Sequence, residues 1–220
     1  MRGVFDIVGP VMIGPSSSHT AGAVRLGLMA RKILGERVVR VGIQLHGSFA
    51  RTGRGHGTDK ALLAGIMGFL PDNERIRDAL ALAGQQGLEY SFQSVDLGEV
   101  HPNTAVMHLV GASGRVATVC GASIGGGNIR ITNINGYAVE LSGEYPALIV
   151  IHHDRPGVIM QVTSILARRG LNIAFMRVSR QARGEMSLML LELDEPLPET
   201  VVDECCSYAD VETAMAIPAI

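Results

Sequence analysis

The C-terminal part of the chain, residues 147–220, constrains the fold most, because each of its short segments has its own start and stop signal. Apolar strand-like segments lie at 147–152, 172–180, 186–193 and 211–217. Helical segments begin near 158, with a stop at Gly170, and at 198–208. The order βαββαβ predicts a ferredoxin-like split βαβ unit. Because such a sheet leaves one face and one edge strand open, we expect the module to self-associate.

The preceding residues mix strands with helices and predict a separate α/β domain. Its expected elements are an apolar segment at 4–8, a helix after 18, a strand at 38–45, a buried helix at 59–70, a more polar helix at 72–86, and strands at 104–110, 115–123, 128–134 and 137–141. Asn135-Gly136 predicts a hairpin turn between the last two strands. The turn-forming residues 142–146 then break the pattern, so we expect domains at 1–143 and 147–220.

Composition excludes several classes of function. The formal net charge is −2 and charged residues make up 18% of the 220 residues, which leaves no electrostatic footprint for nucleic acid or an anionic membrane. The sequence has neither a secretory leader nor an apolar run long enough to span a bilayer. The three cysteines form neither a CxxC motif nor a disulfide framework, which fits a reducing compartment. We therefore expect a cytoplasmic protein that binds neither nucleic acid nor membrane.

A polar cluster, Pro-Ser-Ser-Ser-His-Thr at residues 15–20, precedes a helical stripe of apolar residues that begins at Leu26. Four hydroxyls and His19 therefore lie at a predicted helix N-terminus. Unpaired backbone N–H groups and the helix dipole favour a small carboxylate or phosphate there. The alternative is an ordinary Ser/Thr N-cap preceded by a proline turn. Capping needs one hydroxyl, so the surplus favours binding.

Residues 46–60 form a second polar segment, which leaves the predicted strand 38–45 and enters the predicted buried helix. A loop at the carboxyl end of a strand that feeds a helix N-terminus is a common ligand site. The alternative is a long flexible connection capped by Thr58 or Asp59. A third segment, the glycine-rich stretch 123–129, is typical of a bulge or tight corner between strands.

The C-terminal module resembles an ACT domain, the small-molecule-sensing module of amino-acid enzymes. The resemblance rests on HDRPGV at 153–158 and GLNIA at 170–174. It implies effector contacts from Asp154, Gly157 and Asn172, where Gly157 lets backbone N–H groups approach a carboxylate and Asp154 takes an ammonium group. The alternative is structural, with Asp154 capping the helix that Pro156 begins.

Three segments together, GPSSSHTAG at 14–22, HGSFARTGRGHGTDKA at 46–61 and SIGGGNI at 123–129, resemble the beta subunit of bacterial iron-sulfur L-serine dehydratases. The resemblance covers nearly the whole chain, and relatives of the first domain resemble an allosteric substrate-binding domain. It implies degradation of L-serine to pyruvate and ammonia by way of aminoacrylate, with a 4Fe-4S cluster and without pyridoxal phosphate. An open iron of that cluster would act as a Lewis acid on the leaving hydroxide.

The resemblance also implies a partner, because single-chain relatives add a cysteine-bearing catalytic half that this chain lacks. We expect an alpha subunit to carry the cluster ligands and the general base, with no metal ligand on this chain. His19 is the expected catalytic residue, and a first set of expected substrate contacts surrounds it in sequence: Ser17, Ser18 and Thr20. The role of this set is to grip the serine carboxylate and orient its hydroxyl. A second set, for substrate or for shaping the interface, is His46, Ser48, Thr52 and His56.

Two other classes of function compete with this interpretation. In the first, His19, His46 and His56, with Asp59, bind zinc in their own right, although no HxH or HExxH spacing sharpens that pattern. In the second, the chain is a non-catalytic amino-acid sensor that uses the ACT module to control a partner. The sensor hypothesis gives no role to the polar segments at 15–20 and 46–60.

Overall fold

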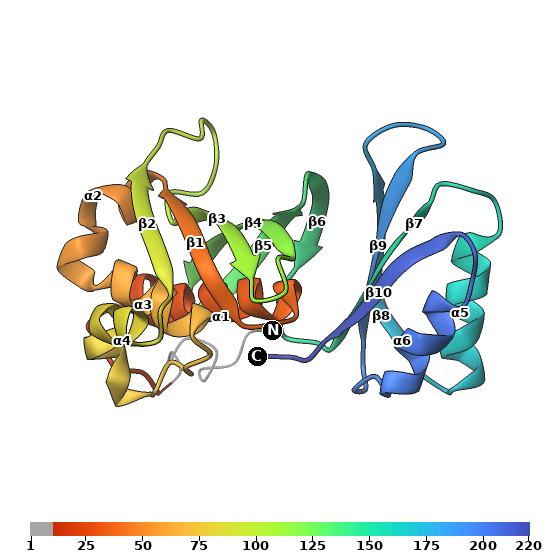
Figure 1. Ribbon diagram of the computed structural model, residues 1–220, viewed down its shortest axis with the longest axis horizontal. Helices are drawn as coiled ribbons and strands as arrows, with labels where there is room; N and C mark the ends of the chain where they lie inside the picture. Colours follow the sequence, from red (N-terminus) through yellow and green to blue (C-terminus); the bar gives the residue numbers. More distant parts are fainter. Residues whose placement is uncertain (1–10) are drawn as a thin grey trace. The chain divides into compact units, whose positions relative to one another are not determined.

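A computed structural model describes residues 11–220 and divides the chain into two compact units, Met1–Asn135 and Gly136–Ile220 (Figure 1). The division falls in the turn after Ile134, where Asn135 and Gly136 both have positive φ. This turn confirms the hairpin predicted from the Asn-Gly pair. The predicted apolar segment at 4–8 lies outside the described residues, and the domain limits 1–143 and 147–220 stay a prediction.

A mixed sheet forms the framework of the first unit. Within this unit the order is β2-β1-β3-β4-β5, with strands β1 (Val38–Leu45), β2 (Glu89–Ser94), β3 (Thr104–Gly111), β4 (Val116–Gly125) and β5 (Asn128–Ile134). Strand β6 (Tyr137–Leu141) belongs to the second unit. Strands β1 and β2 are parallel, whereas the pairs β1–β3, β3–β4 and β4–β5 are antiparallel. The pattern of buried and exposed positions alternates along β1 and β3, as expected for strands with one face on a core.

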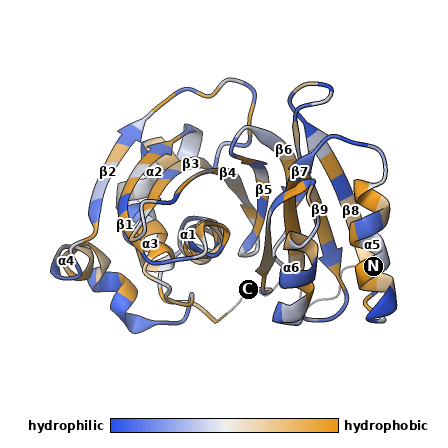
Figure 2. Ribbon diagram, turned by 45° about the vertical axis from the view of Figure 1, so that its right-hand side comes forward, coloured by the Kyte–Doolittle hydropathy of each residue, from blue (hydrophilic) through white to orange (hydrophobic). Residues whose placement is uncertain are grey.

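Four α-helices belong to this unit between residues 11 and 135. They are α1 (Gly22–Leu34), α2 (Gly47–His56), α3 (Thr58–Ile66) and α4 (Ala79–Gln85), with a π-helical turn η2 (Ser17–Ala21) before α1 and a 3-10 turn η3 (Glu74–Asp78) before α4. Figure 2 shows α1 end-on inside the curve of the strands, and ten of its residues are buried there. Gly35, with a left-handed φ of 82°, ends α1 by donating its N–H to Arg31 O. Helix α1 therefore forms the centre of the first core.

Two glycines allow α1 and α3 to touch backbone to backbone. A Cβ atom added to Gly65 in α3 would lie 2.0 Å from Val24 O and 2.6 Å from Leu28 N of α1. A Cβ atom added to Gly27 in α1 would lie 2.2 Å from Leu62 O of α3. Since real Cβ atoms do not approach backbone so closely, both positions require glycine at the observed helix separation.

The second unit has the predicted βαββαβ order. Its elements are β7 (Ala147–His153), α5 (Val158–Arg168), β8 (Ile173–Arg180), β9 (Met186–Leu193), α6 (Glu199–Cys206) and β10 (Val211–Ile217). The sheet order is β10-β7-β9-β8, and each neighbouring pair is antiparallel. This is the split βαβ arrangement expected of a ferredoxin-like fold, so the sequence prediction is confirmed.

One apolar core holds the second unit together. It takes residues from β7, β9 and β10 on the sheet and from one face of each helix, namely Leu148, Val150, Val158, Val162, Ile165, Leu166, Met189, Leu191, Leu193, Val201, Cys205, Val211 and Ala214. Burial of a single large apolar side chain of this kind contributes about 1.5–3 kcal/mol. Strand β8 ends this sheet order and lies against β6, where Ser179 Oγ donates a hydrogen bond to Ala138 O. Its Phe175, Met176 and Val178 are exposed.

The first unit departs from the sequence prediction in three places. Helix α2 occupies most of the segment 46–60, which the sequence predicts as a loop. Strand β2 was not predicted, and the polar helix expected at 72–86 is divided into the 3-10 turn and α4. Between residues 11 and 220, no helix combines the length and the apolar character needed to cross a membrane.

Candidate functional site

The π-helical turn η2 builds the site around His19. Ser16 is its N-cap, with extended backbone, and its Oγ accepts a hydrogen bond from His19 N at 3.1 Å. The turn closes when Gly22 donates its N–H to Ser17 O, one residue beyond an α-helical bond. One hydroxyl of the predicted polar cluster thus serves as the cap. Ser17 and Ser18 lie half-buried within the turn itself.

The imidazole of His19 contacts two hydroxyls of α2. Its Nε2 lies 3.1 Å from Ser48 Oγ and 3.2 Å from Thr52 Oγ1, and these two oxygens lie 3.3 Å apart. The other ring nitrogen, Nδ1, lies 3.5 Å from Ser16 Oγ. Residues that are 29 and 33 positions from His19 in sequence are therefore brought to one nitrogen of its ring.

Two further rings surround His19. The His56 ring centroid lies 4.9 Å from that of His19, and buried Phe49 presents an edge-to-face contact at 5.4 Å. Burial and, to a lesser extent, the neighbouring His56 lower the pKa of His19, although a hydrogen bond with the backbone of Ser48 opposes the shift. The site therefore holds His19 in its neutral form at neutral pH, available to both donate and accept a hydrogen bond.

The carbonyl of Pro102 fixes the start of α2. It accepts hydrogen bonds from Ser48 N at 2.7 Å and Phe49 N at 3.4 Å. Gly47 has a positive φ of 54°, and a Cβ atom there would lie 2.7 Å from Pro102 O. The loop before β3 thus positions the two consecutive residues that contact His19, Ser48 through its hydroxyl and Phe49 through its ring.

Thr20 joins the turn to the end of α2. Its side chain is buried, its Oγ1 donates to His56 O at 3.5 Å, and a Cβ atom on Gly14 would meet its side-chain atoms at 2.7 Å. Gly14 has a φ of 127°, which favours glycine. The Thr20 hydroxyl is therefore used to hold His56 beside His19.

His46 lies apart from this cluster, although the sequence analysis placed it with His56. Its Nδ1 accepts a hydrogen bond from Leu97 N at 3.1 Å, so that nitrogen carries no proton and its 3.7 Å contact with Asp96 is not a hydrogen-bonded ion pair. Of the second predicted set, the structure brings Ser48, Thr52 and His56 to His19. His46 instead holds the loop that follows β2.

The zinc hypothesis lacks a complete ligand set in the described part of the chain. His19 and His56 are adjacent, but His46 is engaged by the loop after β2, and Asp59 accepts its hydrogen bond from Lys60 N. No group of three His, Cys, Asp or Glu side chains within residues 11–220 is placed to hold a metal ion. The described residues therefore do not bring His19, His46, His56 and Asp59 together as the zinc hypothesis requires.

The glycine-rich segment 123–129 forms the turn between β4 and β5. Gly125, Gly126 and Gly127 all have positive φ, which confirms the predicted tight corner. Ser123 is fully buried against η2 and α1, since a Cβ atom on Gly22 would lie 2.0 Å from its Oγ. This segment supports the back of the His19 turn.

The structure separates the three residues expected to bind an effector. Asp154 Oδ2 accepts hydrogen bonds from Arg180 Nη1 at 2.6 Å and Gly184 N at 3.1 Å, which lower the pKa of its carboxyl. Asn172 Nδ2 donates to Asp194 Oδ2 at 2.6 Å. Since Arg180 ends β8 and Asn172 precedes its first residue, these side chains lie at opposite ends of an eight-residue strand, roughly 25 Å long at the usual rise.

Gly157 is the N-cap of α5, with a left-handed φ of 97°, and no side chain caps this helix. The structural alternative in which Asp154 is the cap is therefore wrong: its carboxylate instead ties the β8–β9 turn. One small molecule on a single copy of this module cannot contact both Asp154 and Asn172.

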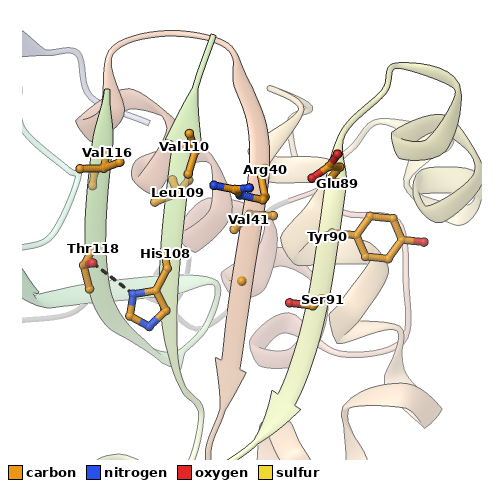
Figure 3. A pocket seen from close by; sticks show the side chains of 12 residues that line it. Arg40, Val41, Glu89, Tyr90, Ser91, His108, Leu109, Val110, Val116 and Thr118 are labelled. Carbon is orange, nitrogen blue, oxygen red and sulfur yellow. Dashed lines mark hydrogen bonds between the residues drawn. The ribbon is translucent and has the colours of Figure 1, made fainter. Parts of the chain in front are cut away.

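A shallow hollow of about 530 Å³ lies on the sheet of the first unit, outside the predicted site (Figure 3). Strands β1, β2, β3 and β4 supply its walls, and His108 Nδ1 lies 3.1 Å from Thr118 Oγ1 within it. Arg40 and Glu89 stand on neighbouring strands at its rim. None of the predicted site residues lines this hollow.

Sequence reasoning missed two members of the His19 site. Phe49 stands between polar residues in a segment without apolar periodicity, so only its position next to Ser48 could have indicated it. Ser16 was part of the polar cluster but was not separated from its neighbours. An N-cap hydroxyl accepts a hydrogen bond from the backbone N–H three residues later. The spacing between Ser16 and His19 could therefore have identified Ser16 as the cap.

Comparisons with known proteins agree with this division into two units. Residues 3–92 match the family described as serine dehydratase beta chain, and residues 148–211 match the family described as AHAS small subunit-like ACT domain. The fold and the site thus define a chain in which an ACT domain follows an α/β unit with a histidine–hydroxyl cluster.

Full-length relatives identify the family. The chain is 44% identical over 210 residues to the probable L-serine dehydratase beta chain of Bacillus subtilis, which covers 96% of this chain and 95% of that protein. It is 42% identical over 198 residues to the L-serine dehydratase beta chain of Peptoniphilus asaccharolyticus, covering 90% and 89%. The chain belongs to the serine dehydratase beta-chain family.

A more distant similarity extends beyond that family. The D-3-phosphoglycerate dehydrogenase of a Synechocystis species is 28% identical over 200 residues, covering 89% of this chain but 35% of that larger protein. Most of this chain is therefore similar to about one third of a larger enzyme.

Proposed function

We propose that this chain is the beta subunit of an L-serine ammonia-lyase that converts L-serine to pyruvate and ammonia together with an alpha subunit. The observation that carries the proposal is the match to two beta chains along nearly their whole lengths. The convergence of His19, Ser48, Thr52 and His56 supports it, because these side chains come from the two segments that carry the family resemblance.

In this proposal the π-helical turn binds the carboxylate of L-serine. Ser17 and Ser18 lie in the turn, Thr20 fixes its far end, and the first N–H groups of the helix lack intrahelical partners. Neutral His19 is the catalytic residue, and it orients the substrate hydroxyl and amino groups toward the alpha subunit.

The second set of residues surrounds that substrate. Ser48, Thr52 and His56 shape the pocket through their contacts around His19. His46 shapes the surface that meets the alpha subunit, since its own contacts fix the loop after β2. The role of His46 is therefore separate from that of the other three.

A 4Fe-4S cluster does not fit the cysteines of this chain. Cys205 is buried in the core of the second unit, where burial raises the pKa of its thiol to about 11, whereas Cys120 lies on β4 of the first unit. Cys206 is exposed beside Cys205 on α6. We assign the cluster ligands and the general base to the alpha subunit, and the free cysteines support a reducing, cytoplasmic location.

The ACT domain regulates the enzyme and joins two copies of the chain. Support for self-association is the exposed apolar surface on β8, where Phe175 is 60% and Met176 is 49% exposed. Pairing of copies would bring the separated Asp154 and Asn172 of different chains within reach of one amino-acid effector. Phe175→Glu should lower the mass of the assembly in sedimentation experiments, and an unchanged mass would contradict this surface.

Anaerobic co-expression of this chain with the alpha subunit tests the proposed reaction. We expect L-serine-dependent pyruvate release from the two chains together and none from either alone. His19→Ala should abolish turnover, whereas His108→Ala, whose imidazole lies in the hollow on the sheet, should retain it. Normal turnover in His19→Ala would contradict the site. Amino-acid binding without activity in any combination would favour a sensor.

A further inference from the structure

The hydroxyl of Thr52 has only one proton, and that proton is already used. Thr52 Oγ1 donates to Ser48 O at 2.9 Å, the i to i+4 bond that a threonine makes within its own helix. The same oxygen lies 3.2 Å from His19 Nε2 and 3.3 Å from Ser48 Oγ. Toward both of these atoms Thr52 can therefore act only as an acceptor.

This count of protons distinguishes the two neutral tautomers of His19. If Nε2 carried a lone pair, it would face the lone pairs of Thr52 Oγ1 at 3.2 Å, and the contact would be repulsive. If Nε2 carries the proton, the same contact is a hydrogen bond, and the Ser48 hydroxyl is free to donate to Thr52. The acceptor on α2 therefore favours protonation of Nε2.

The contacts at the other ring nitrogen agree with this assignment. Ser16 Oγ already accepts the His19 backbone N–H at 3.1 Å, so its own proton is available for another partner. Nδ1 lies 3.5 Å from Ser16 Oγ, and its lone pair can accept a hydrogen bond from the Ser16 hydroxyl or from a donor group of a bound molecule. With the proton on Nε2, no two lone pairs face each other around the ring.

We infer that Thr52 is a positioning residue that fixes His19 as the Nε2–H tautomer and leaves Nδ1 as the acceptor that faces the substrate. This inference rests on the proposed function and makes it more specific. Nδ1 meets a donor of L-serine, its ammonium or hydroxyl group, while the carboxylate is left to the N–H groups of the helix. Thr52 itself does not touch the reacting atoms.

Nitrogen-15 NMR of the full 220-residue chain, labelled at histidine, tests the assignment without partner or substrate. The His19 signals are identified by their absence in His19→Gln. Above the pKa of His19 we expect the proton on Nε2 in the wild type and in Thr52→Ser, which keeps the oxygen. Thr52→Val keeps the shape but removes the acceptor, so both tautomers should then be populated.

The same variants are then assayed as the co-expressed complex. Thr52→Val should lower kcat by about fivefold to tenfold, the loss of one ordinary hydrogen bond, and Thr52→Ser should restore it. A wild-type proton on Nδ1, or an unchanged tautomer in Thr52→Val, would overturn the inference even if the complex is active. An inactive complex with the expected tautomers would instead overturn the proposed reaction and leave the role of Thr52 standing.

Discussion

The close contact of α1 with α3 predicts that Gly65→Ala destabilises the first unit. Alanine is ordinarily the better helix former, by about 0.5–1 kcal/mol, so propensity alone would make this variant more stable. At this position, however, the new Cβ atom would lie 2.0 Å from Val24 O and 2.6 Å from Leu28 N. Both contacts are with backbone, so no side-chain rotation can relieve them, and the helices must separate.

Overpacking of this kind typically costs about 1–3 kcal/mol. After the gain in helix propensity is subtracted, the net loss in the free energy of unfolding is at most about 2.5 kcal/mol, and we expect the upper part of this range because both contacts are with backbone. For a chain of this size, that loss lowers Tm by up to roughly 10 °C. Separation of the helices would also displace η2, which leads into α1, from His56, which precedes α3, so activity should fall as well.

Gly84→Ala provides a matched control, because it makes the same substitution in α4 where a Cβ atom meets nothing within 4 Å. Thermal unfolding of both variants, followed by circular dichroism, should move Tm in opposite directions. A Gly65→Ala variant as stable as Gly84→Ala would refute the backbone-to-backbone contact.

Three other predictions concern titratable groups. Because burial and His56 lower the pKa of His19, an NMR titration of His19 should give a midpoint below the ordinary value of 6.5, and His56→Gln should raise that midpoint. His19 binds its proton more tightly in the unfolded chain, so acidification below about pH 6.5 favours unfolding. Asp154→Asn should accelerate amide exchange at Gly184, whose N–H donates to the Asp154 carboxylate. In the wild type this hydrogen bond is present above about pH 3.8 and should be lost only as the pH falls through the lowered pKa of Asp154. Equal exchange rates in the two proteins would contradict this hydrogen bond. Cys206 should react with iodoacetamide in the native protein long before Cys205, whose buried thiol has a pKa of about 11, and equal rates would argue against that burial.

The second unit could be predicted element by element because its signals are local. Gly170 follows α5 with a positive φ, and each apolar segment matches one strand or one helix face. In the first unit, α2 could not be predicted in the same way. Its sequence contains several glycines and no apolar stripe, and its helical state depends on Pro102 O and on the burial of Phe49. Those contacts come from residues distant in sequence.

The candidate site was predicted in part for the same reason. The sequence indicated that the segments at 15–20 and 46–60 act together, and the structure brings His19, Ser48, Thr52 and His56 to one place. It could not indicate that His46 turns toward Leu97, because the direction of a side chain at a strand end depends on the loop packed against it. Residue types in the sequence indicate which side chains could take part in a site, whereas tertiary contacts determine which of them lie together.

The π-helical turn makes the number of residues before α1 as consequential as their identity. The bond from Gly22 N to Ser17 O encloses one more residue than an α-helical bond would. Loss of a single serine from the run of three would let α1 continue backward as a regular helix, and each residue upstream would rotate by about 100° around its axis. The length of the serine run thus determines the direction of the His19 imidazole, which in the observed turn contacts α2.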